Sequence, residues 1–209
     1  MEGSGKDSLN KALVELERSF DLGKGFLVSL VSTDSDWSFV IKAHALVEAA
    51  TTHLLANHLG TTSLADVLSQ LPQSDPRAGR LAFLRELKLL DQDELRFLQK
   101  FSELRNRLVH NVHNTRFTFV DHLAALRNPD EEFAAWVAIG PKGPQLRASL
   151  RERALRRPKL ELWSSVVFIV ARCEISKIVA RERQHQIDVA LQLLEESADD
   201  LDDDKLEDS

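Results

Sequence analysis

The chain has 209 residues, of which 43% are hydrophobic and 29% are charged, as in an ordinary soluble globular protein. These proportions exclude a fully disordered protein, a collagen and a low-complexity array. Glycine (8 residues) and proline (6 residues) are scarce and tyrosine is absent. Leucine, alanine, glutamate and arginine dominate instead, and this predicts an all-α fold.

The net charge of −6 is concentrated at the C-terminal end of the sequence. Residues 195–209 hold nine carboxylates and one lysine, so the remaining residues carry a net charge of +2. This segment has little to bury and its charges repel one another, which predicts a disordered acidic tail. The tail either keeps the protein soluble or mimics a polyanion over a basic site. The slight positive charge of the body leaves a nucleic-acid partner open.

Cysteine usage and hydropathy indicate the compartment. Cys173 is the single cysteine and cannot form an intrachain disulfide, which fits a reducing compartment. Residues 1–5 show no basic segment followed by an apolar one, so no secretory signal is expected there. The longest apolar run, 166–171, is far shorter than the roughly 20 residues of a membrane span. We therefore expect a cytoplasmic protein with no membrane partner.

Apolar spacing predicts helices along the first half of the chain. Asp7 or Ser8 can cap a first helix, which Gly23 and Gly25 interrupt. We therefore interpret 1–34 as an N-terminal helix and a linker. Ser35 or Asp36 opens a long helix that Gly60 ends, and shorter helices are expected over 63–71 and 76–90.

The second half of the chain contains two further long helices. Asp91 and Glu94 form a capping box at the start of a helix that runs to His110. Residues 114–148 are the least regular part, with an extended piece expected over 115–120. A final helix is predicted over 159–197, with an inner side made of Trp163, Val166, Val167, Val170, Cys173 and Ile178. Five or more helices with short connections predict a bundle, here a domain over 35–194.

One motif in this bundle carries chemistry. Arg105 is followed directly by Asn106 and, five positions after the arginine, by His110, near the end of an amphipathic helix. His110 and Asn106 are four residues apart and share a helix face, so both can address one phosphate. A histidine at a helix end also often caps the last carbonyls, which is the structural alternative.

This motif resembles the signature of the HEPN superfamily, in which arginine precedes histidine by a short spacer and asparagine often follows the arginine. The similarity extends over about 36–120 and is nearest to the mannitol-repressor-like branch, with Phe117-Thr118-Phe119 after the motif. It implies a HEPN-like helical bundle that acts as a homodimer, with two signature helices forming one composite site. It also implies RNA as the substrate and a protein inhibitor or regulatory partner.

The resemblance implies metal-independent RNA cleavage without a cofactor. His110 would exchange protons with the ribose 2′-OH or the leaving 5′ oxygen, Arg105 would stabilise the transition-state charge, and Asn106 would orient the phosphate. The alternative is a non-catalytic transcriptional regulator or interaction module, in which the signature residues hold the dimer together.

Two further groups of residues are candidates for supporting roles. His44 and Glu48 share a face of the early helix and could orient Arg105 across the bundle. No His-Glu-x-x-His motif and no cysteine cluster is present, so no metal site is expected. A basic segment either contacts RNA phosphates, forms a solvated helix face or pairs with the acidic tail; its members are Arg147, Arg151, Arg153, Arg156, Arg157 and Lys159.

Overall fold

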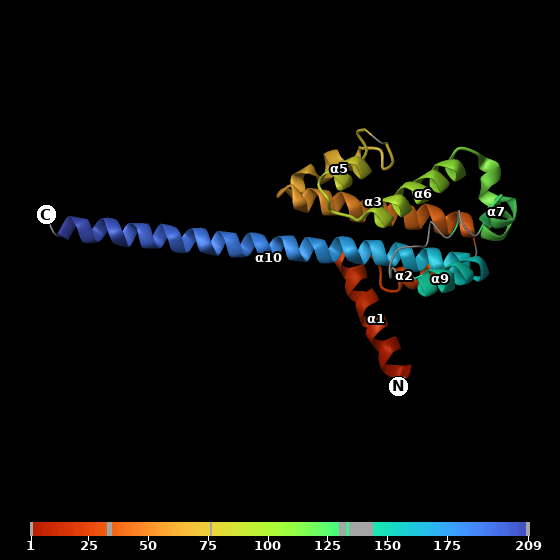
Figure 1. The fold of residues 1–209 in the computed structure, drawn as a ribbon, viewed down its shortest axis with the longest axis horizontal. Coiled ribbons are helices and arrows are strands. Elements are labelled where there is room, and N and C mark those ends of the chain that lie inside the picture. The colour runs from red at the N-terminus through yellow and green to blue at the C-terminus, as the bar shows by residue number, and fades with distance from the viewer. Residues whose placement is uncertain (1, 33–34, 76, 130–132, 134–143, 208–209) are drawn as a thin grey trace.

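The computed structural model describes residues 2–32, 35–75, 77–129, 133 and 144–207, the last segment by its backbone alone from residue 194 onward. Within these ranges the regular structure is helical and contains no strand, which confirms the predicted all-α bundle (Figure 1). Its elements are α1 (Glu2–Ser19), α2 (Phe26–Ser32), α3 (Asp36–His58), η1 (Thr62–Leu64), α4 (Ala65–Ser69), α5 (Arg80–Glu86), α6 (Gln92–Val109), η2 (Val112–Arg116), α7 (Phe119–Ala125), α9 (Pro144–Arg156) and α10 (Pro158–Glu207).

Helices α3 and α10 form the centre of the bundle and lie along each other (Figure 1). Helices α5 and α6 pack on the side of α3 away from α10, while α1, α2 and α9 pack on the other side of α10. Fully buried aromatic side chains fill the interior: Phe39, Phe97, Phe101, Phe119 and Phe133. Leucines of α1 and α2 belong to the same core, so the N-terminal segment is part of the folded bundle.

Helix α3 begins and ends where the sequence predicts. Ser35 is its N-cap, and the Ser35 side chain accepts a hydrogen bond from the backbone N–H of Ser38. Gly60 follows its last turn with φ +73°, a left-handed conformation that glycine adopts at little cost. The backbone N–H of Gly60 donates to the carbonyl of Asn57. Twelve residues of α3 are buried, which places this helix inside the bundle.

The predicted helix over 76–90 is much shorter in the structure, where α5 covers Arg80–Glu86. Asp75 accepts hydrogen bonds from the next turn, at the N–H groups of Arg77 and Ala78. A Cβ at Gly79 would lie 2.5 Å from the Asp75 carbonyl oxygen and 2.7 Å from that of Pro72, so only glycine permits this close approach. At the other end, Lys88 has φ +54° and ends the helix.

The capping box at the start of α6 is confirmed. The Asp91 side chain accepts from the N–H of Glu94 at 2.9 Å, and the Glu94 carboxylate accepts from the N–H of Asp91 at 2.7 Å. We expect Asp91→Ala to lower the free energy of unfolding by about 1 kcal/mol, because the backbone N–H of Glu94 in the first turn loses its acceptor. Urea denaturation measures this, and Gln92→Ala, at an exposed neighbouring position, is the control with an expected change near zero.

The region predicted to be irregular contains more helix than expected. Residues 115–120 do not form an extended piece; they belong largely to η2 and to the start of α7, and only Phe117 and Thr118 between them are non-helical. Thr118 caps α7 by accepting from the N–H of Asp121, and Phe119 is drawn into the core. The cap at Thr118 and the burial of Phe119 thus start a helix where the sequence suggested an extended piece. Most of 130–143 lies outside the described residues.

Helix α10 is longer than predicted and projects far beyond the bundle (Figure 1). The expected inner residues Val166, Val170 and Cys173 are buried, but Ile178 is 57% exposed. The prediction for Ile178 is wrong because Ile178 follows Cys173 by five residues, which turns it to the side of α10 away from the buried Cys173. The acidic segment lies at the free end of α10, beyond the bundle, and residues 195–207 continue the helix there. No helix in the described ranges is long and apolar enough to span a membrane.

Candidate functional site

The three motif residues lie at the C-terminal end of α6. Arg105 and Asn106 are half-buried, and the Arg105 guanidinium donates a hydrogen bond to the Asn106 side-chain oxygen at 3.1 Å. His110 is the exposed C-cap residue of the helix. The structure thus brings Arg105 and Asn106 into contact and leaves His110 one turn further along, open to solvent.

The carbonyls at the end of α6 are capped by residues other than His110. The Trp37 indole N–H donates to the carbonyl of Leu108 at 3.3 Å, and the Asn114 side chain donates to the carbonyl of Arg107 at 2.7 Å. Among the residues that the structure describes, the His110 side chain makes no hydrogen bond or ion pair. The His110 side chain therefore does not cap the last carbonyls of α6, although as the C-cap residue it stands at the negative end of the helix dipole.

The segment 104–120, which contains His110, is rich in arginine and histidine and has no carboxylate. Between Leu104 and Val120 the sequence contains three arginines and two histidines but neither aspartate nor glutamate. Beside the motif residues, Arg107, His113 and Arg116 are exposed. Such a surface attracts a phosphate, and Glu103, one turn before Arg107, offsets part of its charge.

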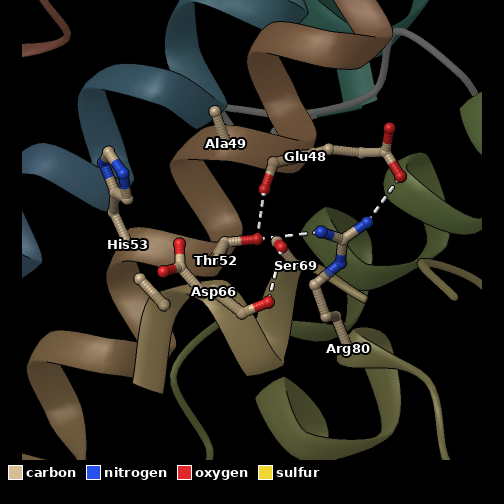
Figure 2. Close-up of a pocket in the computed structure, with 8 residues that line it drawn as sticks. Glu48, Ala49, Thr52, His53, Asp66, Ser69 and Arg80 are labelled. Carbon is tan, nitrogen blue, oxygen red and sulfur yellow. Dashed lines mark hydrogen bonds and ion pairs between the residues drawn. The ribbon is translucent and has the colours of Figure 1, made fainter. Parts of the chain in front are cut away.

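A buried polar network lies behind this surface, between α3, α5 and α6. The His44 Nε2 lies 3.1 Å from the Ser102 Oγ, and its Nδ1 lies 3.2 Å from a Glu48 carboxylate oxygen, at an angle poor for a hydrogen bond. The other Glu48 oxygen accepts from the Arg80 guanidinium at 2.5 Å, and Arg80 also donates to the Thr52 hydroxyl at 2.8 Å (Figure 2). Glu48 is thus the centre of the network.

The charge state of Glu48 follows from these neighbours. Partial burial alone would raise the pKa of its carboxyl, but the contact with His44 and the charges of Arg80 and Arg105 outweigh it and hold the pKa below the usual 4.5. Glu48 is therefore ionised at neutral pH and interacts electrostatically with Arg105. Its direct ion pair is with Arg80, a residue that the sequence reasoning missed because no local pattern marks a buried arginine.

The line of Ser102, His44 and Glu48 has the order of a nucleophile, a base and an orienting carboxylate. Ser102 is 2% exposed and His44 is 3% exposed, so no substrate reaches either side chain. We interpret the line as a structural network that fixes α6 against α3.

A shallow cavity of about 350 Å³ opens beside this network, lined by Glu48, Ala49, Thr52, His53, Ala65, Asp66, Ser69 and Arg80 (Figure 2). The figure shows Arg80 turned toward Glu48 and Thr52, so its charge is used within the protein. His53 and Asp66 lie on the opposite side of the cavity. These groups do not converge on a common point, and the described residues contain no cluster of three or more metal-ligating side chains.

The basic segment has less free charge than the sequence indicates. Three of its cations pair with carboxylates: Arg153 with Glu161, Arg156 with Glu152, and Lys159 with Asp36. Arg151 and Arg157 are exposed, and the side chain of Arg147 lies outside the described part. These intramolecular pairs fix α9 and the start of α10, so the end of α6 is the better candidate for phosphate contact.

No protein-family model, no curated protein and no solved structure matches this chain. The site is therefore defined by its own residues and their geometry, and membership in the HEPN superfamily stays a prediction from the motif.

Proposed function

We propose that this protein binds RNA at the C-terminal end of α6 and cleaves it without a metal ion. The observation that carries the proposal is the free and exposed His110 beside the joined pair of Arg105 and Asn106. A general acid or base must reach its substrate, and His110 does, because Trp37 and Asn114 take over the capping of the helix.

The reaction divides between a base, an acid and an anion-binding group. His110 takes the proton from a ribose 2′-OH, whose oxygen attacks the adjacent phosphorus as the bond to the 5′ oxygen breaks. His110 of a second copy, facing the first as the HEPN resemblance implies, gives a proton to that leaving oxygen. The products are a 2′,3′-cyclic phosphate and a 5′-hydroxyl end. Arg105 binds the charged phosphate oxygens. Asn106 orients the Arg105 side chain and the phosphate.

Cleavage of a mixed RNA pool in the presence of EDTA tests the proposal. Wild-type protein should leave cyclic phosphate ends, and His110→Ala or Arg105→Ala should lower the rate by about 100-fold or more. His53→Ala, which removes an exposed histidine near the C-terminal end of α3, is the matched control and should cleave like wild type.

Two results would contradict the proposal. Equal cleavage by every variant would show that a contaminant is responsible and would exclude the assigned site. RNA binding without cleavage, lost in Arg105→Ala, would favour the non-catalytic regulator instead.

A further inference from the structure

The part of α10 beyond Ala180 projects from the bundle, and its described side chains are exposed. Beyond Ala180, each residue from Arg181 to Leu193 is exposed, including Ile187 at 47% and Leu191 at 54%. The helix continues to Glu207, so its last 27 residues extend about 40 Å at 1.5 Å per residue. An isolated helix is marginal in water, and apolar side chains along it favour a partner that covers them.

Apolar positions on this segment follow a coiled-coil spacing. The spacing alternates between four and three residues over three heptads, and six of the seven positions are apolar. We call these positions the α10 stripe: Ala180, Gln184, Ile187, Leu191, Leu194, Ala198 and Leu201. The stripe is continuous with the buried face of α10, because Cys173 precedes Ala180 by one heptad.

A groove lies along the first half of the stripe. It has a volume of about 670 Å³ and runs between the end of α3 and α10. Ala180, Gln184 and Ile187 line it from α10, together with Arg181 and Arg183. Within the described ranges these two arginines make no hydrogen bond or ion pair through their side chains. The groove is therefore partly apolar and positively charged.

Charge is uneven along the stripe: residues 180–191 hold two arginines and the carboxylates Glu182 and Asp188, whereas the free end is strongly acidic. Arg181 and Arg183 stand at one end, and at the other end seven carboxylates lie between Glu195 and Asp204. Parallel pairing of two α10 helices would place the seven carboxylates of one chain against the same seven of the other. Antiparallel pairing places them against the arginines of the groove, so electrostatics selects the antiparallel direction.

We propose that two copies of this protein associate through antiparallel pairing of their α10 stripes, with Leu191 at the centre. Leu191 is the middle one of the seven positions, so every position meets another stripe position of the second copy. The pairs are Leu191 with Leu191, Ile187 with Leu194, Gln184 with Ala198, and Ala180 with Leu201. The acidic segment of each copy then lies in the basic groove of the other, beside Arg181 and Arg183. This pairing does not rest on the proposed ribonuclease function.

Oligomeric state measured by analytical ultracentrifugation tests the pairing. The wild-type chain should sediment as a dimer, and Leu191→Asp should raise the dimer dissociation constant by about 100-fold or more, because the carboxylates would meet at the apolar centre. Val189→Asp is the matched control: it introduces the same charge at an exposed position (42%) on the opposite side of the helix and should leave the dimer intact. Circular dichroism of both variants checks that the bundle remains folded.

Disulfide cross-linking tests the direction. Two single variants, Gln184→Cys and Ala198→Cys, should cross-link when mixed and should not when each is oxidised alone. The native Cys173 does not interfere, since it is 2% exposed and burial raises the pKa of its thiol to about 12. A wild-type monomer, a dimer unaffected by Leu191→Asp, or cross-links of each variant with itself would overturn the proposal. RNA cleavage is scored separately, so its loss or presence does not alter this result.

Discussion

Replacing Glu48 by glutamine should lower the free energy of unfolding by about 3 kcal/mol, one of the two largest effects that we expect from a single substitution. The side chain of Arg80 is 4% exposed and pairs with Glu48 across 32 positions of sequence. Glutamine keeps the shape of the side chain but removes its charge, so a buried guanidinium loses its counter-ion. Because Glu48 itself is 30% exposed, water screens part of the loss, and we place the effect at the lower end of the usual range.

Urea denaturation of Glu48→Gln beside Glu86→Gln measures this effect. Glu86 also pairs with an arginine, Arg85, but both side chains are more than half exposed, and such pairs contribute little. We therefore expect Glu86→Gln to unfold like wild type. If the two variants lost equal stability, the buried pair between Glu48 and Arg80 would have no special role.

The same carboxylate should make stability depend on pH. The folded-state pKa of Glu48 lies below its usual 4.5, so its contribution is complete above that value and is lost as the pH falls through the folded pKa. Between about pH 5 and pH 3, the free energy of unfolding should fall more steeply for wild type than for Glu48→Gln. Parallel curves over this range would show that Glu48 does not contribute.

Phe101→Ala should cost about 4 kcal/mol of stability, the second large effect. The ring is fully buried, stacks on Phe97 with 5.6 Å between centroids, and lies 5.6 Å from the ring of His44. Removal of the ring leaves a cavity between α3 and α6 and weakens the packing against the polar network. The change also loosens the helix that carries the candidate site.

Thermal unfolding of Phe101→Ala and Phe83→Ala compares a buried ring with an exposed one. Phe83 is 42% exposed on the short helix α5, and its removal should cost less than about 1 kcal/mol. A small effect at Phe101 would mean that α6 is not held by this core. Phe101→Ala leaves the three motif residues unchanged. The RNA cleavage rate of the folded variant, compared with that of wild type, therefore shows whether the exact position of α6 matters.

The parts of the fold that sequence predicted well are those fixed by neighbouring residues. The N-cap Ser35, the glycine at the end of α3 and the capping box of Asp91 and Glu94 each satisfy backbone groups within one helical turn. Such signals are complete in a few residues, and they hold whatever packs nearby. Apolar spacing likewise gave the order of the long helices.

The wrong predictions concern contacts made at long range. Helix α5 is short because Gly79 approaches the backbone of Asp75 and Pro72, and apolar spacing over 76–90 contains no sign of this approach. Ile178 is apolar, but it lies five residues after Cys173 and therefore on a side of α10 that the other helices do not cover.

For the candidate site, the sequence predicted residue types but not their partners. The motif residues stand at the helix end where the spacing placed them, and Glu48 lies close enough to Arg105 to interact electrostatically. The pairing of Glu48 with Arg80 could not be predicted, since the sequence of α3 does not indicate which arginine or lysine of the chain pairs with Glu48. A carboxylate within an otherwise apolar helix does signal that some cation must reach it, and that signal alone pointed toward a partner.

The placement of the two proposed contacts determines what the molecule can build. The motif end of α6 and the free end of α10 lie at opposite ends of the molecule (Figure 1). Pairing through α10 holds two bundles apart along the joined helices, so the motif ends of that pair face outward. If the motif end of α6 also pairs with the motif end of another copy, each chain has two independent self-complementary contacts. Chains joined alternately through these two contacts form an open-ended fibre or a closed ring with an even number of chains. The size of the assembly would then increase with protein concentration, and Leu191→Asp, which disrupts the α10 contact, would reduce it to units of two chains.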